Sequence, residues 1–210
     1  MKRISLLLLL VVLACGSVLA QNKVLSLDGD GDYVEVKPAA SLSILDYVTV
    51  SAWIKITASP EETDWKNIIG QDNDHRNYNF YIKGNGKGKW ALHLANASNV
   101  GWLLTHTDFL LERNVWYHVI GQVSKTAEFH RYYINGEPAP ILTYHLGDMA
   151  LASQLNSTDF NSLAVIQILS NETTTITSIG FATGDFFNGL IDEVQVWNKL
   201  LPSSGIQASM

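Results

Sequence analysis

Cysteine is almost absent from this sequence. The chain has 210 residues and a single cysteine, Cys15, which lies in the apolar N-terminal segment. No intrachain disulfide can therefore stabilise the fold. A chain of this length can bury enough apolar surface for one domain without such cross-links, but it is too short for two ordinary domains.

Clusters of basic residues are also missing. Fourteen Lys and Arg stand against twenty Asp and Glu, for a net charge of −6. A protein that binds the phosphates of nucleic acid needs a basic face, and none is present. The composition therefore excludes a nucleic-acid partner, and the excess of carboxylates leaves side chains that could hold a divalent cation.

Long hydrophobic runs are absent after the N-terminus. Lys2 and Arg3 precede the apolar run at residues 6–12, and Val18-Leu19-Ala20 supplies a cleavage site. The run is shorter than the roughly 20 residues that span a bilayer, so it predicts a cleaved signal peptide. We expect a signal peptide at 1–20, one domain at 21–203 and a short C-terminal tail at 204–210. The mature domain would be secreted, extracellular or in the cell envelope.

An alternative route of export involves the cysteine. Residues 12–15 (VLAC) resemble a bacterial lipobox, in which the cysteine is lipid-modified and becomes the new N-terminus. Cys15 would then tether the domain to a membrane. Both routes export the domain.

Helical periodicity is scarce as well, and the dominant period is two. Between residues 48 and 56, Val and Ile alternate with Thr, Ser and Trp, which predicts a strand with one buried and one exposed face. Further strand-like runs are at 24–27, 33–36, 67–70, 78–82, 90–95, 116–123, 129–134, 175–180 and 189–196. The sequence thus predicts an all-β domain.

Turn residues predict how these strands connect. Asn135-Gly136 favours a tight hairpin, and residues 84–88 (GNGKG) form a flexible connection between two runs. Residues 138–174 predict a long excursion with at least one extra strand, and residues 200–210 a helical turn. The mostly antiparallel pairing favours a two-sheet sandwich or jelly roll.

Several blocks of sequence resemble one known superfamily, in the same order along the chain. They are residues 25–36 (LSLDGDGDYVEV), 48–55 (VTVSAWIK), 116–119 (WYHV), 132–137 (YYINGE) and 187–198 (FNGLIDEVQVWN). These blocks resemble laminin G-like domains of the concanavalin A-like lectin and glucanase superfamily. The resemblance implies a two-sheet antiparallel jelly roll over most of the chain.

The resemblance also implies a structural calcium site. In this superfamily the first and last strands lie together and often share a calcium ion. Asp28, Asp30, Asp32 and Asp192 are the candidate ligands, because Ca²⁺ prefers carboxylate and carbonyl oxygens. The alternative is plain turn chemistry, since Asp and Gly accommodate tight bends.

Catalysis finds little support in the sequence. Glucanases of the superfamily use two carboxylates in an E-x-D-x-x-E pattern, and the nearest match here is Glu62, Asp64 and Asn67. Asn67 has no carboxyl group. The histidines are scattered without metal-ligand spacing, and we expect a non-catalytic protein.

Binding is the remaining class of function. Aromatic side chains cover the C–H faces of sugars while polar side chains bind their hydroxyls. The candidate ligand-binding residues are Asn73, Asp74, His75, Arg76, Tyr78, Trp90 and Trp102, with Trp65 close by. We expect a glycan-binding module, and the alternatives are an adhesive domain that binds a cell-surface or extracellular protein and, third, a glycoside hydrolase. Most of these aromatics could instead pack in the core.

Overall fold

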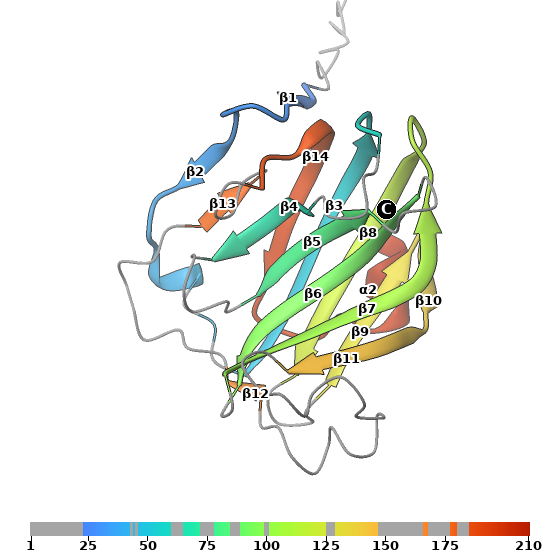
Figure 1. Ribbon diagram of the computed structural model, residues 1–210. Helices are drawn as coiled ribbons and strands as arrows, with labels where there is room; N and C mark the ends of the chain where they lie inside the picture. The colour runs from blue at the N-terminus through green and yellow to red at the C-terminus, as the bar shows by residue number, and fades with distance from the viewer. Residues whose placement is uncertain are drawn as a thin grey trace, which may run out of the picture.

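Figure 1 shows the computed structural model of the chain, in which two sheets pack face to face. The structure describes residues 23–42, 44, 46–59, 65–71, 78–84, 89–98, 101–124, 129–146, 166–167, 177–179 and 185–210. The signal peptide and the lipobox predicted from the sequence lie outside these residues. Within the described part, no helix is long and apolar enough to cross a membrane.

The first sheet has six strands. In spatial order they are β1 (Leu25–Asp28), β14 (Asn188–Trp197), β3 (Tyr47–Ile56), β8 (Trp116–Ser124), β9 (Phe129–Ile134) and β10 (Glu137–Ala139). Neighbouring strands run antiparallel. The first and last strands of the described chain, β1 and β14, therefore lie side by side, as the resemblance implied.

The second sheet has eight strands. In spatial order they are β11 (Ile141–Leu146), β7 (Gly101–Leu111), β6 (Trp90–Ser98), β5 (Asn79–Gly84), β4 (Trp65–Gln71), β13 (Thr177–Ile179) and β2 (Val34–Val36), while β12 (Ile166–Gln167) pairs with β6. The described chain also forms the 3₁₀ turn η1 (Ala40–Leu42) and the helix α2 (Ser203–Ala208). The predicted all-β jelly-roll sandwich is confirmed.

The core lies between the two sheets. The inward side chains of β3, from Val48 to Ile56, are fully buried, as their alternation predicted. They meet Phe80 and Ile82 of β5 and the leucines of β6 in one cluster. Each fully buried aliphatic side chain contributes about 1.5–3 kcal/mol. Gly121 of β8 keeps the sheets close, because a Cβ there would lie 3.1 Å from the Phe80 ring.

The outward face of β3 differs from the prediction. Thr49 and Ser51 were expected to be exposed, but both are fully buried. The C-terminal segment covers this face: Thr49 Oγ1 donates to the carbonyl oxygen of Lys199 at 2.6 Å, and Gln122 Nε2 donates to that of Leu201 at 3.0 Å. A period of two identifies the two faces of a strand but not what packs on each.

The helix α2 closes a second apolar cluster on this outer face. Ile206 is fully buried and packs with Ile120 of β8 and with Leu201. Figure 1 shows α2 behind the six-stranded sheet. The helical turn predicted near the C-terminus is confirmed, and Ile206, within the expected tail, packs on the domain.

One long strand, β7, was not predicted. β7 and β11 form one margin of the eight-stranded sheet, where Ile141 pairs with Thr107 and Leu146 with Leu103. β7 was not predicted because its sequence, GWLLTHTDFLL, does not alternate regularly between apolar and polar residues. In the structure its pairing with β6 shifts register once. β11 is the extra strand predicted for the excursion at 138–174.

Candidate functional site

A row of rings crosses the outer face of the eight-stranded sheet. Phe80 and Ile82 point into the core, so the side chain between them, Tyr81, points to the opposite face. Tyr81 stands opposite His93 of β6, and His93 stands opposite His106 of β7. Trp65 of β4, the strand on the other side of β5 from β6, contacts both Tyr81 and His93. We call Trp65, Tyr81, His93 and His106 the ring row.

The rings of this row are in contact. The ring centroids of His93 and His106 are 4.9 Å apart, and those of Trp65 and His93 are 5.0 Å apart. Trp65 meets Tyr81 edge to face at 6.0 Å. The register of the sheet aligns Tyr81, His93 and His106, whereas Trp65 stands opposite Lys83 and reaches the other rings diagonally. Pairing on both sides of each strand limits the movement of the rings.

Amide side chains border the ring row. Asn79 Nδ2 donates to the hydroxyl oxygen of Tyr81 at 2.7 Å, and both Asn67 and Asn79 are buried. Oδ1 of Asn79 has no hydrogen-bond partner among the described residues. A Cβ at Gly70 would lie 2.6 Å from this oxygen, so the glycine makes room for the amide.

The charge beside the row is positive. The ammonium group of Lys83 lies 4.7 Å from the centre of the Trp65 ring, within cation–π range. The row itself contains no carboxylate. Its rings offer apolar faces, and its imidazoles, phenol and neighbouring amides offer hydrogen bonds, which is the mixture that a sugar requires.

The predicted ligand-binding residues are only partly placed by the structure. Asn73, Asp74, His75 and Arg76 lie outside the described residues, and Trp102 lies in β7 with its side chain outside the description. Trp65, half-buried, belongs to the ring row.

Tyr78 and Trp90 require a correction. Both were expected to be exposed, and both are fully buried in the core cluster. Alternation could have shown this for Trp90, because it shares a face of β6 with Leu92 and Leu94. The same alternation places His93 on the outer face, and no role for it was predicted from the sequence.

The predicted calcium ligands do not all come together. Asp28 stands opposite Asn188, whereas Asp192 stands opposite Trp53, four residues farther along β14. At about 3.4 Å per residue, this puts Asp192 and Asp28 at different ends of β1. Asp28, Asp30 and Asp32 remain together in the turn between β1 and β2, and all three are exposed.

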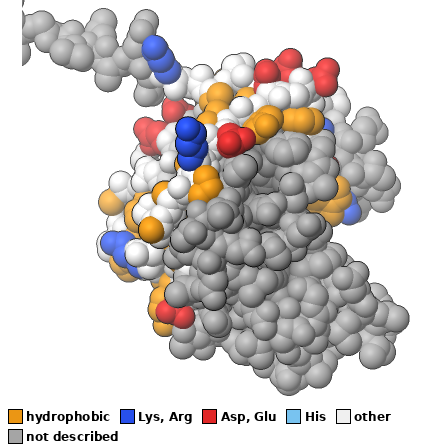
Figure 2. All heavy atoms as spheres, turned by 90° about the vertical axis from the view of Figure 1, so that its left-hand side faces the viewer, with side chains coloured by type: hydrophobic (Ala, Val, Ile, Leu, Met, Phe, Trp, Pro, Cys, Tyr) orange, Lys and Arg blue, Asp and Glu red, His pale blue; other side chains and the backbone are white. Residues whose placement is uncertain are grey.

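Hydrogen bonds account for much of this turn. Asp28 Oδ1 accepts from the backbone N–H of Asp30 at 2.8 Å, and Gly29 and Gly31 have φ of 85° and 88°. Asn188 Nδ2 donates to the carbonyl oxygen of Asp28 at 2.6 Å. No group of three or more His, Cys, Asp or Glu able to hold a metal ion is found within the described residues. Figure 2 shows acidic side chains gathered at the top of the β1 and β2 side of the molecule.

Only part of the segment that resembles the glucanase carboxylate pattern lies among the described residues. Glu62 and Asp64 lie outside it, while Trp65 and Asn67 belong to β4 and not to a loop. Asn67 stands opposite Tyr81, next to the ring row.

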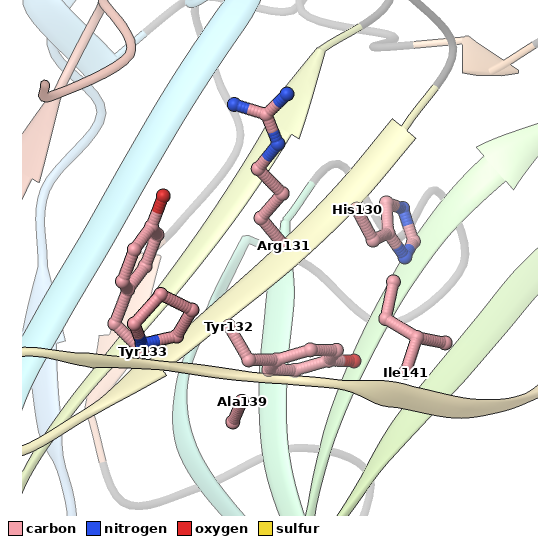
Figure 3. Close-up of a pocket in the computed structure, with 7 residues that line it drawn as sticks. His130, Arg131, Tyr132, Tyr133, Ala139 and Ile141 are labelled. Carbon is pink, nitrogen blue, oxygen red and sulfur yellow. The ribbon is translucent and has the colours of Figure 1, made fainter. Parts of the chain in front are cut away.

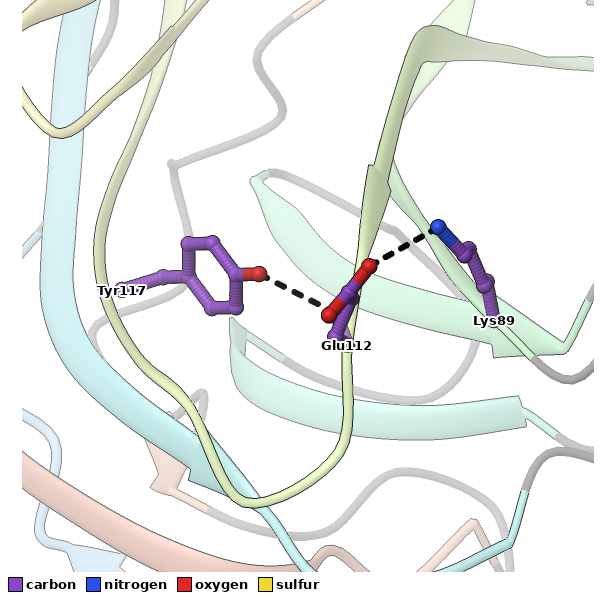
Figure 4. A network of polar contacts seen from close by, with 3 residues as sticks. All are labelled: Lys89, Glu112 and Tyr117. Carbon is purple, nitrogen blue, oxygen red and sulfur yellow. Dashed lines mark hydrogen bonds and ion pairs between the residues drawn. The ribbon is translucent and has the colours of Figure 1, made fainter.

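A second cluster of polar side chains lies where β7 connects to β8. Lys89 Nζ pairs with Glu112 Oε1 at 2.9 Å (Figure 4). The backbone N–H of Glu112 donates to the Tyr117 hydroxyl oxygen at 3.2 Å. The hydrogen bond to Glu112 raises the pKa of Lys89. Beside this group Phe109 and Val115 are exposed.

A buried polar network lies between the sheets, at the margin formed by β9 and β7. The Tyr132 hydroxyl donates to the carbonyl oxygen of Thr105 at 2.8 Å, so the Thr105 hydroxyl must donate to Tyr132 Oη, 2.6 Å away. Thr105 Oγ1 is then left to accept from His130 Nδ1, at 2.8 Å. His130 is therefore the Nδ1–H tautomer, and its Nε2 is an acceptor.

We expect His130 to make stability depend on pH. Burial lowers the pKa of His130 to about 3, whereas the unfolded chain takes up this proton near pH 6.5. Because the unfolded state binds more protons between these values, the free energy of unfolding falls as pH drops from about 6.5 toward 3, with a slope that approaches about 1.4 kcal/mol per pH unit. Urea unfolding between about pH 7 and pH 4 measures this slope.

The variant His130→Phe is the control for this prediction, since it keeps a ring of similar size and cannot titrate. Burial also lowers the pKa of His118, so some pH dependence should remain in the variant. The variant should lose the part of the slope that one titrating histidine contributes. Equal slopes in the two proteins would contradict the prediction.

Comparisons with known proteins agree with this fold. The family model described as the concanavalin A-like lectin/glucanases superfamily matches residues 28–207. No protein of curated function matches the chain significantly.

Solved structures of similar fold share little sequence with the chain. The Ruminococcus gnavus IT-sialidase CBM40 bound to α2,3-sialyllactose is 15% identical with a TM-score of 0.59, over 89% of this chain and 96% of that one. A SAP-like pentraxin from Limulus polyphemus is 17% identical with a TM-score of 0.53, over 87% and 78%. The binding domain of botulinum neurotoxin DC in complex with SialylT is 17% identical with a TM-score of 0.58, over 87% of this chain and 40% of that one.

Proposed function

Because the chain belongs to the concanavalin A-like lectin/glucanase superfamily, we propose that it is a non-catalytic carbohydrate-binding module. Its ligand lies across the ring row on the outer face of the eight-stranded sheet. The observation that carries this proposal is the alignment of Trp65, Tyr81, His93 and His106 across four neighbouring strands, with ring centroids 4.9–6.0 Å apart.

The chemistry of the row suits a sugar. Half-buried Trp65 and Tyr81 can cover an apolar C–H face, while half-buried His106 and the ammonium group of Lys83 can reach the hydroxyls at its rim. Two of the structural neighbours are described as bound to a sialylated ligand, which supports this class of partner without identifying the sugar.

The proposal of a non-catalytic module rests on the composition of the row. A glycoside hydrolase needs two carboxyl groups that face each other across the scissile bond, about 5–9.5 Å apart. The ring row and the two asparagines beside it supply no carboxyl group. Binding without hydrolysis is therefore the activity that these residues support.

Replacing Trp65 tests the proposal. We expect the domain from Gln21 onward to bind a defined set of glycans on an array, and Trp65→Ala to weaken that binding about tenfold or more, because the loss of a central aromatic residue from a binding site costs about 2 kcal/mol. Isothermal titration with the best glycan of the array measures the affinity. Trp116→Ala is the matched control: Trp116 is also half-buried but lies in β8 of the other sheet.

Two outcomes would overturn the proposal. One is equal affinity of the Trp65→Ala variant and the wild type, which would place the sugar elsewhere. The other is an array with no bound glycan, which favours the second candidate, an adhesive domain. Exposed Phe109 and Val115 beside the Lys89–Glu112 pair are the observation that supports a protein partner.

We also propose that the domain is exported, through cleavage before Gln21 or lipid attachment at Cys15. The N-terminal sequence and the mass of the protein recovered from its host distinguish the two routes. The calcium site stays a prediction with Asp28, Asp30, Asp32 and Asp192 as its candidate ligands, although these described residues form no group of three that could hold the ion as they stand. A melting temperature that rises with calcium and falls with EDTA would support it, because a ligand that binds only the folded state must stabilise it.

A further inference from the structure

A pocket of about 500 Å³ lies at the margin of the six-stranded sheet. β10 pairs with β9 only from Tyr132 to Ile134, and the chain then crosses to the other sheet, where Ile141 begins β11. The first half of β9 therefore has no β10 residue beside it, and the pocket opens at this place. Its volume is within the range of small-molecule sites, about 300–1,000 Å³.

One wall of the pocket carries the buried polar network. Figure 3 shows His130 and Tyr132 on one side of β9, with Ile141 close to His130. Their side chains are 1% exposed, and Nε2 of His130 has no hydrogen-bond partner among the described residues. A buried acceptor without a partner costs about 1–3 kcal/mol, so a donor that reaches it is bound favourably.

A second wall of the pocket is apolar. Pro138, Ala139 and Ile141 line the pocket together with Arg131 and Tyr133, and none of the lining residues that the structure describes carries a carboxylate. Figure 3 shows Arg131 and Tyr133 on the other side of β9 from His130. The side chains of this apolar wall carry no hydrogen-bond donor, so they offer none to the carbonyl group of an amide ligand. A single hydroxyl group, which can donate to Nε2 without bringing a carbonyl, suits the pocket better.

We infer that this pocket is a second ligand site, which binds a neutral molecule carrying a hydroxyl group on an apolar body, with the hydroxyl donating to Nε2 of His130. The site is lined by β9 and β10 of the six-stranded sheet and by Ile141 of β11, and it contains no residue of the ring row, so it does not depend on the function proposed for that row. Its two determinants are the acceptor on His130 and the apolar wall formed by Pro138, Ala139 and Ile141.

Two probes with the same apolar body test the inference. Cyclohexanol carries the donor, and cyclohexyl methyl ether does not. We expect cyclohexanol to shift the backbone amide resonances of Tyr132, Ala139 and Ile141 on titration, with an affinity about five- to tenfold higher than that of the ether. In His130→Phe the two probes should bind with equal affinity, because the acceptor is gone while a ring remains.

A second variant keeps the test decisive if His130→Phe does not fold. Ala139→Leu leaves the polar network intact and fills the pocket, so neither probe should shift these resonances, and its amide spectrum reports whether the fold is kept. Equal affinity of both probes for the wild type, or shifts confined to other parts of the domain, would overturn the inference. So would unchanged binding of cyclohexanol to Ala139→Leu.

Discussion

Replacing Gly189 with alanine should destabilise the domain by at least about 3 kcal/mol. Gly189 has φ of 148°, and a Cβ atom there would overlap the carbonyl oxygen of Lys55 and lie 3.1 Å from the Cα of Ile56. Both are backbone atoms of β3, the strand paired with β14, so they cannot move aside without breaking the ladder. Urea unfolding at neutral pH measures the loss.

The control for this variant is Gly31→Ala. Gly31 also has positive φ, 88°, but a Cβ there would meet no atom within 4 Å. Its replacement should cost about 1 kcal/mol, the conformational penalty alone. The difference between the two variants isolates the clash with β3. A cost at Gly189 no larger than that at Gly31 would show that β14 and β3 do not approach each other this closely.

The second large effect is expected from Ile206→Asp. Ile206 is fully buried between α2 and the six-stranded sheet, against Ile120 and Leu201. A carboxylate cannot stay there, so the helix should detach, and a helix of six residues does not persist without its packing. We expect a loss of about 3–4 kcal/mol in the free energy of unfolding, measured in urea.

Gln207→Asp is the matched control, because the neighbouring side chain is exposed on the same helix. It adds the same charge and should change stability by less than about 0.5 kcal/mol. Detachment can be followed separately at the side-chain amide of Gln122, which donates to the carbonyl oxygen of Leu201. An unchanged amide signal in Ile206→Asp would mean that α2 does not cover this face.

Much of the fold was predictable from local pattern. The alternation at residues 48–56 identified β3, and Asn135-Gly136 identified the hairpin between β9 and β10, where both residues have positive φ, 51° and 81°. Such signals work because side-chain direction along a strand, and the φ values of a tight turn, are decided by adjacent residues.

The last strand shows where local pattern is insufficient. Strict alternation would place Ile191 and Glu193 on the same face. In the structure, β14 has a bulge between Asp192 and Gln195, with φ of 47° at Glu193. The extra residue lets Val194 and Val196 pack against the same core as Ile191. A bulge depends on the partner strand, so the pattern within β14 alone cannot locate it.

The candidate site was the least predictable part. The sequence suggested exposed aromatics, but Tyr78 and Trp90 are buried, while Tyr81, His93 and His106 were not selected. Each of these three lies on a separate strand, and nothing in the chain order brings them together. Likewise, His130 meets Thr105 only because β9 and β7 face each other across the core.

Residue order therefore decided which segments become strands, which face of each strand is apolar, and where the Asn135-Gly136 hairpin turns. Those choices depend on the side chains and backbone angles of neighbouring residues. Strand register, the packing of α2 on the outer face of β3, the ring row and the pocket beside His130 were decided by tertiary structure. They depend on contacts between segments that are far apart in the chain, whose alignment is chosen by the packing of the whole core.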